Sequence, residues 1–221
     1  MSLIVLASAS AAETQALGTQ LAAKLCPNDV LLLVGGLGAG KTQFAQGVAA
    51  GLGISEPVCS PTFNLLLSHD AKLADGTATR LYHFDLYRLD TAEQLDDIDY
   101  FALLEDGAIS LVEWGDRFPE ALPEDYLLIE VNVLGEARDP TYKARHCAPE
   151  PQSAAPPTRY CEPGLQSLTA LTGAVSVNAA IPPDTTPSIA VLPDGLWSRE
   201  LLVSAVGARS ERLLADWQAL Q

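Results

Sequence analysis

The chain has 221 residues, 48% of them apolar, which suits one compact domain with an appendage. Its net charge of −15, from 13 basic and 28 acidic residues, disfavours direct tight binding of DNA or RNA, because such proteins carry a basic face. No apolar run reaches the ~18 residues of a transmembrane helix. The four cysteines form no Cys-x-x-Cys pair, which makes a disulfide framework or a zinc site improbable and favours the cytoplasm.

The first elements in chain order are an apolar strand and a helix. Residues 3–7 form a short apolar run, and Ser10 and Glu13 have the spacing of a helix-capping box. "DVLLLVGG" then predicts a buried strand at residues 29–36. "KTQFAQGVAAGLG", residues 41–53, predicts a helix with apolar side chains at four-residue spacing and a final glycine to end it.

The link between that strand and helix fits a phosphate-binding loop. Gly35 is followed, after four residues, by Gly40, Lys41 and Thr42, the pattern G-x-x-x-x-G-K-[ST]. Small residues let backbone N–H groups surround phosphate oxygens, and the start of the helix adds the positive end of its dipole. Lys41 would reach the β- and γ-phosphates and Thr42 would bind Mg²⁺. The alternative is a glycine-rich turn with a surface lysine.

A possible nucleotide-sensing segment follows, "CSPTFNLL" at residues 59–66. In nucleotide switches such a segment offers a hydroxyl to the γ-phosphate and its metal, and Ser60 and Thr62 are the candidates. The alternative is an ordinary turn at Pro61.

Two acidic residues end the next predicted strands. Asp85 ends the apolar part of "TRLYHFDLYRL", residues 79–89, and Glu113 ends that of "AISLVEWG", residues 108–115. In a parallel sheet both would lie at the edge that carries the phosphate loop. One would hold the metal, directly or through water, and the other would orient the attacking water or the ligands around the metal. Alternatively each is only a solvated strand end. His83, in the strand predicted at residues 79–89, is interpreted as a packed or hydrogen-bonded residue rather than a catalyst.

Residues 90–106, "DTAEQLDDIDYFALLED", predict one helix opened by Thr91 with Gln94 three residues later. Its acidic residues form either a solvated face or a docking face for a basic partner. "YLLIEVNVLG", residues 126–135, predicts a further strand, and residues 198–220 predict a closing strand and a C-terminal helix.

Between them, residues 139–195 are rich in Pro, Ala, Thr and Ser and lack periodicity. That composition predicts a weakly ordered insert, with a docking element as the alternative. We therefore expect residues 1–138 and 196–221 to form one domain interrupted by this insert. Alternating strands and helices indicate an α/β fold: three layers around a mostly parallel sheet, as in P-loop NTPases.

Four segments together resemble the TsaE family, formerly YjeE: "GGLGAGKT", "SPTFNLL", "LYHFDLYRL" and "ISLVEWGDRFPEALP", in this order and spacing. The resemblance covers residues 1–134 and resumes at Ser198. It implies a single-domain α/β ATPase that binds ATP and Mg²⁺, hydrolyses ATP slowly, and works with TsaB and TsaD. TsaD threonylcarbamoylates adenosine 37 of tRNAs that read ANN codons, and ATP hydrolysis would reset the assembly. The resemblance implies contact with tRNA only through these partners.

The resemblance also implies roles for individual residues. Thr42 and Glu113 would hold Mg²⁺, Asp85 would act near the γ-phosphate, and Trp114 would report nucleotide binding by fluorescence. The phosphates would be bound by Leu37, Gly38, Ala39, Gly40, Lys41 and Thr42.

Further from the loop, Thr14 matches a family position near the nucleotide. Arg199 matches a basic position in the closing strand, with Arg138 as its rival because of the insert. Gly36 departs from the Asp or Asn common in the family, which removes any contact made by that side chain.

Two other functions compete with hydrolysis. A P-loop kinase for a small molecule would need an acceptor pocket and an arginine-rich lid, and few arginines lie near the candidate site. A non-hydrolytic regulatory module would not need the chemistry of Asp85 and Glu113. Neither alternative accounts for the four segments together.

Overall fold

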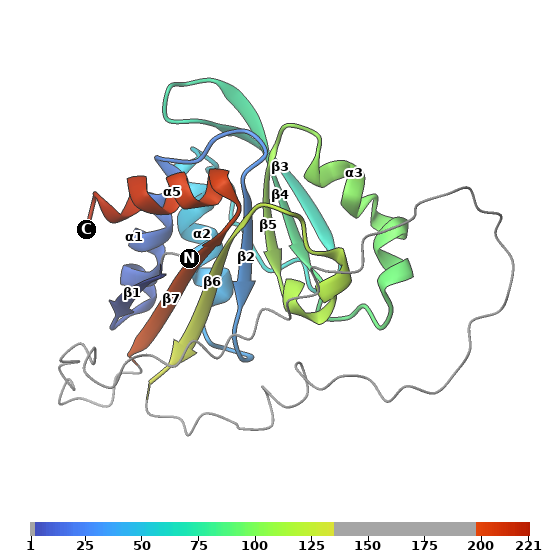
Figure 1. Ribbon diagram of the computed structural model, residues 1–221, viewed down its shortest axis with the longest axis horizontal. Helices are drawn as coiled ribbons and strands as arrows, with labels where there is room; N and C mark the ends of the chain where they lie inside the picture. Colours follow the sequence, from blue (N-terminus) through green and yellow to red (C-terminus); the bar gives the residue numbers. More distant parts are fainter. Residues whose placement is uncertain (1–2, 135–197) are drawn as a thin grey trace, which may run out of the picture.

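A computed structural model describes residues 3–134 and 198–221, which build a seven-stranded sheet with helices on both faces (Figure 1). The strands are β1 (Leu3–Ser8), β2 (Val30–Val34), β3 (Leu66–Lys72), β4 (Ala78–Asp85), β5 (Ile109–Glu113), β6 (Tyr126–Val133) and β7 (Arg199–Val206). The α-helices are α1 (Ala11–Ala22), α2 (Lys41–Gly51), α3 (Tyr100–Leu104) and α5 (Ala208–Gln218). The 3₁₀-helices are η1 (Ala92–Ile98), η2 (Gly115–Arg117) and η3 (Pro119–Ala121).

The sheet is mostly parallel, as the alternation of strands and helices predicted. Its order is β1-β7-β6-β2-β5-β4-β3. The pairs β6–β2, β2–β5 and β5–β4 are parallel, whereas β1–β7, β7–β6 and β4–β3 are antiparallel. Hence β1, β6, β2, β5 and β4 run in one direction. The carboxyl ends of β2, β4, β5 and β6 meet at the lower edge in Figure 1.

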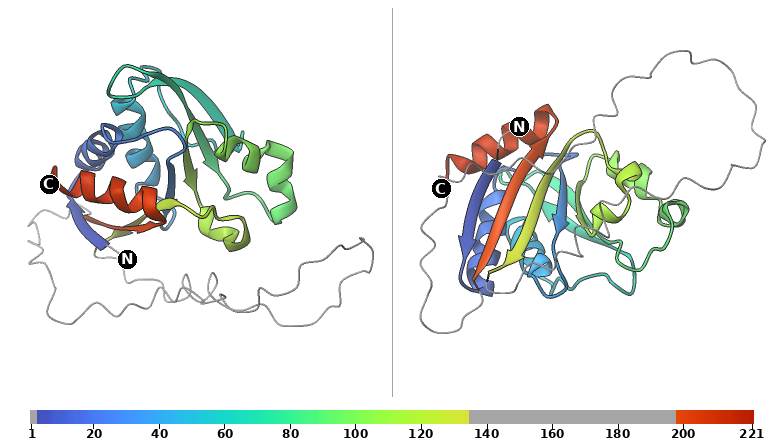
Figure 2. Two further views of the ribbon diagram at one scale, coloured as in Figure 1. Left: turned by 45° about the horizontal axis from the view of Figure 1, so that its top comes forward. Right: turned by 60° about the horizontal axis from the view of Figure 1, so that its bottom comes forward.

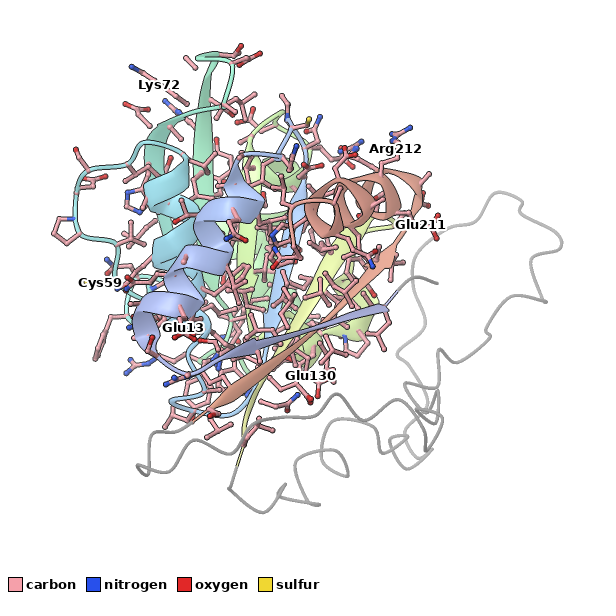
Figure 3. The ribbon with its side chains drawn as sticks, turned by 90° about the vertical axis from the view of Figure 1, so that its left-hand side faces the viewer. Glu13, Cys59, Lys72, Glu130, Glu211 and Arg212 are labelled. Carbon is pink, nitrogen blue, oxygen red and sulfur yellow. The ribbon has the colours of Figure 1, made fainter. Side chains whose placement is uncertain are left out.

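Two apolar cores separate the three layers. One core joins α1, α2 and α5 to one face of the sheet, with Phe44 against Trp217 at a ring-centroid distance of 6.2 Å. The other packs α3 and the 3₁₀-helices against the opposite face, with Phe84 against Tyr100. Figure 2 shows α5 beside α1, and Gln221 donates a hydrogen bond to Gln20. Charged side chains such as Lys72, Glu211 and Arg212 lie at the periphery (Figure 3).

The start of α1 has the predicted cap. The Glu13 backbone N–H donates to the Ser10 hydroxyl at 3.1 Å, and the Glu13 carboxylate accepts from the backbone N–H of Ala9 at 2.7 Å. Helix α1 then approaches α2 closely, because a Cβ atom at Gly47 would lie 2.0 Å from the Gln15 carbonyl oxygen. This contact of the two helices requires a residue without a side chain.

Two sequence expectations were wrong in detail. The single helix expected at 90–106 is split into η1 and α3 because Asp99 adopts the left-handed conformation, with φ of 53°. Its predicted start is present, since the Gln94 side chain accepts from the Thr91 backbone N–H at 3.1 Å. Strand β3 was missed, although the Asp75–Gly76 pair that links it to β4 is a typical hairpin signal.

The expected insert, residues 139–195, and Arg138 lie outside the described residues. The chain leaves the sheet after β6 and returns at β7, its antiparallel neighbour, where the Leu134 N–H donates to the Ser198 carbonyl oxygen at 2.7 Å. The pairing of β6 with β7 therefore closes the domain at the base of this segment. In the ranges 3–134 and 198–221 no helix is long and apolar enough to cross a membrane.

Asp29, just before β2, gives the fold a measurable dependence on pH. Its side chain is only 4% exposed, and burial raises the pKa of its carboxyl to about 6, although the Cys26 N–H and Arg209 oppose the rise. A raised folded-state pKa stabilises the protonated form, so this contribution is present at low pH and is lost as the pH rises from about 4 to 6.

We predict that Asp29→Asn raises the free energy of unfolding at pH 7 by about 1–3 kcal/mol, since it removes a buried charge but keeps an acceptor for the Cys26 N–H. Urea denaturation between pH 4 and 7 would measure this. The variant should also lose less stability than the wild type across that range. The exposed Asp97→Asn is the control, and equal profiles for all three proteins would contradict the prediction.

Candidate functional site

The candidate site lies where β2, β4 and β5 end beside the start of α2. Parallel pairing sets Leu33 of β2 against Glu113, and Asp85 of β4 against the same Glu113. The two acidic side chains predicted at strand ends therefore share one edge of the sheet with the phosphate-loop sequence. Both are buried, at 2% exposure each, and they are not merely solvated strand ends.

The glycine-rich loop folds tightly between β2 and α2. Gly38 and Gly40 have φ of 76° and 113°, which only glycine adopts readily, and α2 begins at Lys41 directly after them. Arg199 of β7 lies against this loop, and its Nε donates to the Ala39 carbonyl oxygen at 2.7 Å. A Cβ atom at Gly40 would lie 2.8 Å from that Nε. The structure thus places Arg199 beside the loop, while Arg138 lies outside the described residues.

Lys41 is folded back inside the site. Its ammonium group donates to the carbonyl oxygens of Gly35 and Gly36 at 2.8 and 2.9 Å, and lies 3.9 Å from the ring centroid of Trp114. Burial lowers the pKa of Lys41, an effect that the nearby carboxylates, Glu113 foremost, oppose. The acceptors that this cation contacts are uncharged, and an ionised phosphate oxygen would be a stronger partner for it.

Trp114 reaches this position through an unusual backbone conformation. Its φ is 63°, in the left-handed region that bulky residues rarely adopt. The turn is fixed by hydrogen bonds from Trp114 N–H to Leu33 and from Leu86 N–H to Glu113. The Tyr87 ring packs against the indole at a centroid distance of 5.0 Å. Sequence reasoning gave no role to Tyr87, whose position depends on the pairing of β4 with β5.

Glu113 connects the strand end to the phosphate loop. The Thr42 hydroxyl donates to its Oε1 at 3.1 Å, with Oε2 at 3.4 Å. The Nε2 of His83 lies 3.1 Å from the same Oε1. The first turn of α2 is therefore linked directly to the end of β5.

Asp85 organises the segment that sequence analysis singled out as a nucleotide sensor. The hydroxyls of Ser60 and Thr62 each donate to its Oδ2 at 2.6 Å. Its Oδ1 accepts from the Tyr87 backbone N–H at 3.0 Å. Both candidate hydroxyls are thereby brought to the edge of the sheet.

Thr14 is tied to its own helix start. It is fully buried, and its hydroxyl bonds to the Ser8 hydroxyl at 2.8 Å and to the Ser10 carbonyl oxygen at 3.1 Å. Its neighbour Gln15 donates to Gln43 and Gln46 of α2. Thr14 thus supports the packing of α1 near the first turns of α2, and a role near the nucleotide stays a prediction.

The oxygen atoms of Thr42 and Glu113 fit Mg²⁺ in kind. Mg²⁺ prefers oxygen ligands and is often held by one or two carboxylates together with substrate phosphates. Among residues 3–134 and 198–221, no group of three or more His, Cys, Asp and Glu side chains could hold a metal. Thr42 and Glu113 would leave the remaining Mg²⁺ positions to phosphate oxygens and water, which is common where Mg²⁺ is bound with a nucleotide.

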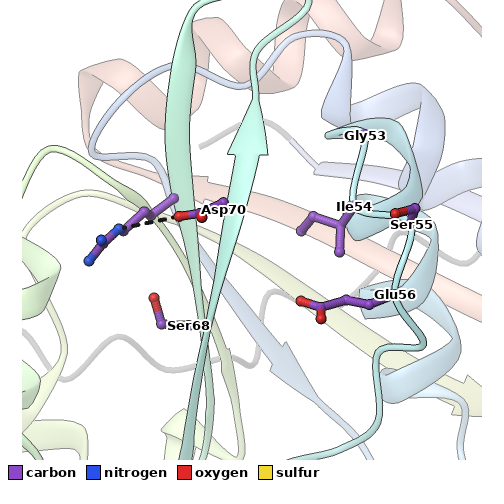
Figure 4. Close-up of a pocket in the computed structure, with 7 residues that line it drawn as sticks. Gly53, Ile54, Ser55, Glu56, Ser68 and Asp70 are labelled. Atoms are coloured by element: carbon purple, nitrogen blue, oxygen red, sulfur yellow. Dashed lines mark ion pairs between the residues drawn. The ribbon is translucent and has the colours of Figure 1, made fainter.

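A separate hollow of about 390 Å³ lies near the other end of α2, away from the phosphate loop (Figure 4). Glu56 and Ile54 border it on one side, and Asp70 of β3 with Arg80 of β4 borders the other. The Asp70–Arg80 ion pair, at 3.7 Å, is largely exposed. None of the residues predicted to bind nucleotide lines this hollow.

Comparison with known proteins identifies the family. The family model described as "Threonylcarbamoyl adenosine biosynthesis protein TsaE" matches residues 8–140. The chain belongs to the TsaE family. It is 39% identical over 129 residues to the tRNA threonylcarbamoyladenosine biosynthesis protein TsaE of Treponema pallidum, covering 58% of this chain and 91% of the relative. It is 41% identical over 134 residues to the Bacillus subtilis protein of the same name, covering 60% and 80%.

A solved structure agrees with this assignment. The crystal structure of Bacillus subtilis YdiB aligns with a TM-score of 0.58 and 25% sequence identity, covering 99% of this chain and 95% of that one. The range matched by the TsaE family model, residues 8–140, spans the phosphate loop, Asp85 and Glu113.

We predict that adding Mg²⁺ and a non-hydrolysable ATP analogue changes the fluorescence of Trp114. A phosphate group would compete with the indole and the loop carbonyls for the Lys41 ammonium, and would alter the surroundings of the ring. Titration of the wild type should show a saturable change that Trp114→Phe removes. Trp217→Phe, in the core against Phe44, is the control and should keep it. If the fluorescence change persists in Trp114→Phe, the signal does not come from Trp114 and the prediction is contradicted.

Proposed function

We propose that this chain is an Mg²⁺-dependent ATPase subunit required for the threonylcarbamoylation of adenosine 37 in tRNAs that read ANN codons. The observation that carries the proposal is the Thr42–Glu113 contact beside a phosphate loop. The similarity to relatives named as tRNA threonylcarbamoyladenosine biosynthesis proteins supports this proposal. The protein would act in the cytoplasm, and its substrate would be ATP.

Phosphate binding would use the loop and Lys41. The backbone N–H groups of residues 37–42 and the start of α2 would surround the phosphate oxygens. Lys41 would exchange its two carbonyl acceptors and the Trp114 ring for the β- and γ-phosphates. Arg199, already bonded to Ala39, would support the loop from the closing strand.

Hydrolysis would depend on the two acidic residues. Thr42 and Glu113 would hold Mg²⁺, which neutralises charge on the β- and γ-phosphate oxygens when bound. Asp85 would hold the Ser60 and Thr62 hydroxyls near the γ-phosphate and would orient the attacking water. In this assignment Glu113 serves the metal and Asp85 serves the water.

Partner proteins would complete the site. Leu37 in the loop is 84% exposed and Phe63, next to Thr62, is 82% exposed. Apolar side chains with this exposure, next to the proposed reaction centre, indicate a surface to which another protein binds. TsaB and TsaD are the proposed partners, and slow turnover alone would reflect their absence. A net charge of −15 is consistent with leaving tRNA to those partners.

We predict slow ATP hydrolysis by the purified chain, stimulated by the cognate TsaB and TsaD. Glu113→Ala should reduce turnover at least about 100-fold, because it removes a ligand of the Mg²⁺ that would stabilise charge in the transition state. Phosphate release measured with and without the partners would test this. Glu211→Ala is the control, since Glu211 is exposed and lies on α5, which contributes no residue to the candidate site.

Three results would separate the candidate functions. Stimulated hydrolysis that Glu113→Ala abolishes supports the ATPase subunit. Binding of Mg·ATP with no hydrolysis in any mixture would contradict it and favour the regulatory module. Transfer of the γ-phosphate to a small molecule would instead indicate a kinase.

A further inference from the structure

His83 is a buried polar residue in an otherwise apolar layer. It is 0% exposed and lies in β4 opposite Leu111 of β5, a residue of the core beneath α2. Its neighbour two residues earlier, Leu81, belongs to the same core. A polar group in such a place costs free energy unless it is hydrogen-bonded, so an apolar side chain would fill the position more simply.

The hydrogen bond of His83 is made to Glu113. Its Nε2 lies 3.1 Å from Oε1 of Glu113, and both side chains are almost inaccessible to solvent. Its Nδ1 is buried and has no hydrogen-bond partner within residues 3–134 and 198–221. A proton on Nδ1 would therefore be an unsatisfied buried donor, which assigns the proton to Nε2. His83 thus donates to the carboxylate.

Two donors from different elements fix the Glu113 carboxylate. Oε1 accepts from His83 of β4 and from Thr42 of α2, each at 3.1 Å. Oε2 is 3.4 Å from the Thr42 hydroxyl, and the hydrogen bond of His83 is made to Oε1. His83 therefore holds the carboxylate from the core side and Thr42 from the loop side, which leaves Oε2 as the less engaged oxygen for a ligand at the phosphate loop.

We infer that His83 is a positioning residue, whose N–H orients Glu113 so that one carboxylate oxygen faces the Mg²⁺ that accompanies ATP. This inference rests on the proposed function. Hydrogen-bonding partners of metal ligands commonly set metal affinity, and their loss costs about 10–100-fold. His83 itself would touch neither nucleotide nor metal, because Glu113 lies between it and Thr42.

Three substitutions distinguish positioning from packing. His83→Gln can place an amide N–H near the position of Nε2. His83→Asn can place one only near Nδ1, away from Glu113, and His83→Met fills the space without a donor. The measurement is Mn²⁺ affinity for the complex of the full chain with a non-hydrolysable ATP analogue, by electron paramagnetic resonance. Metal-free affinity for the analogue and the melting temperature are measured alongside.

We expect His83→Met and His83→Asn to weaken Mn²⁺ binding by about tenfold or more while metal-free analogue affinity stays unchanged. His83→Gln should remain close to the wild type. If His83→Met does not fold, the comparison of Gln with Asn carries the test. Equal weakening in Gln and Asn, or none in either, would overturn the inference and leave the proposed function standing. A wild type that binds no Mn²⁺ with the analogue would overturn both.

Discussion

The parallel pairing of β2, β5 and β4 is the constraint on which the site depends. It brings Glu113 beside Leu33, and Asp85 beside Glu113, at the edge where the chain turns into α2. From that arrangement the Thr42–Glu113 hydrogen bond follows, since α2 begins at the same edge. A shift of β5 by one residue would turn Glu113 to the other face and leave Thr42 without its partner.

The same arrangement explains why charges can be buried here. The three charged residues Lys41, Asp85 and Glu113 are each at most 5% exposed. Lys41 contacts carbonyl oxygens and an indole, and Asp85 accepts from two hydroxyls. Glu113 contacts a hydroxyl and an imidazole. The cation and the two carboxylates also offset one another electrostatically. The groups that the proposed ATP and Mg²⁺ would engage are thus held in place by contacts with one another and with the backbone.

Sequence patterns predicted β2, β5 and β6 because these central strands are rich in apolar residues. Strand β3 was missed because it lies at the edge of the sheet and carries polar residues such as Ser68 and Asp70. The break at Asp99 escaped prediction since nothing local requires that residue to be left-handed. The prediction that Asp85 and Glu113 share one edge came from their positions at the ends of two strands expected to run parallel. The stacking of Lys41 on Trp114 and the contact of His83 with Glu113 depend on pairing between distant strands.

The central claim is that Thr42 and Glu113 act on one Mg²⁺ ion. A double-mutant cycle with Thr42→Val and Glu113→Gln tests it directly, by calorimetric measurement of how much Mg²⁺ strengthens binding of a non-hydrolysable ATP analogue. If both side chains serve the same ion, the effects of the two substitutions are non-additive, with a coupling of about 1 kcal/mol or more. Additive effects, or an undiminished Mg²⁺ effect in either variant, would contradict a shared metal site.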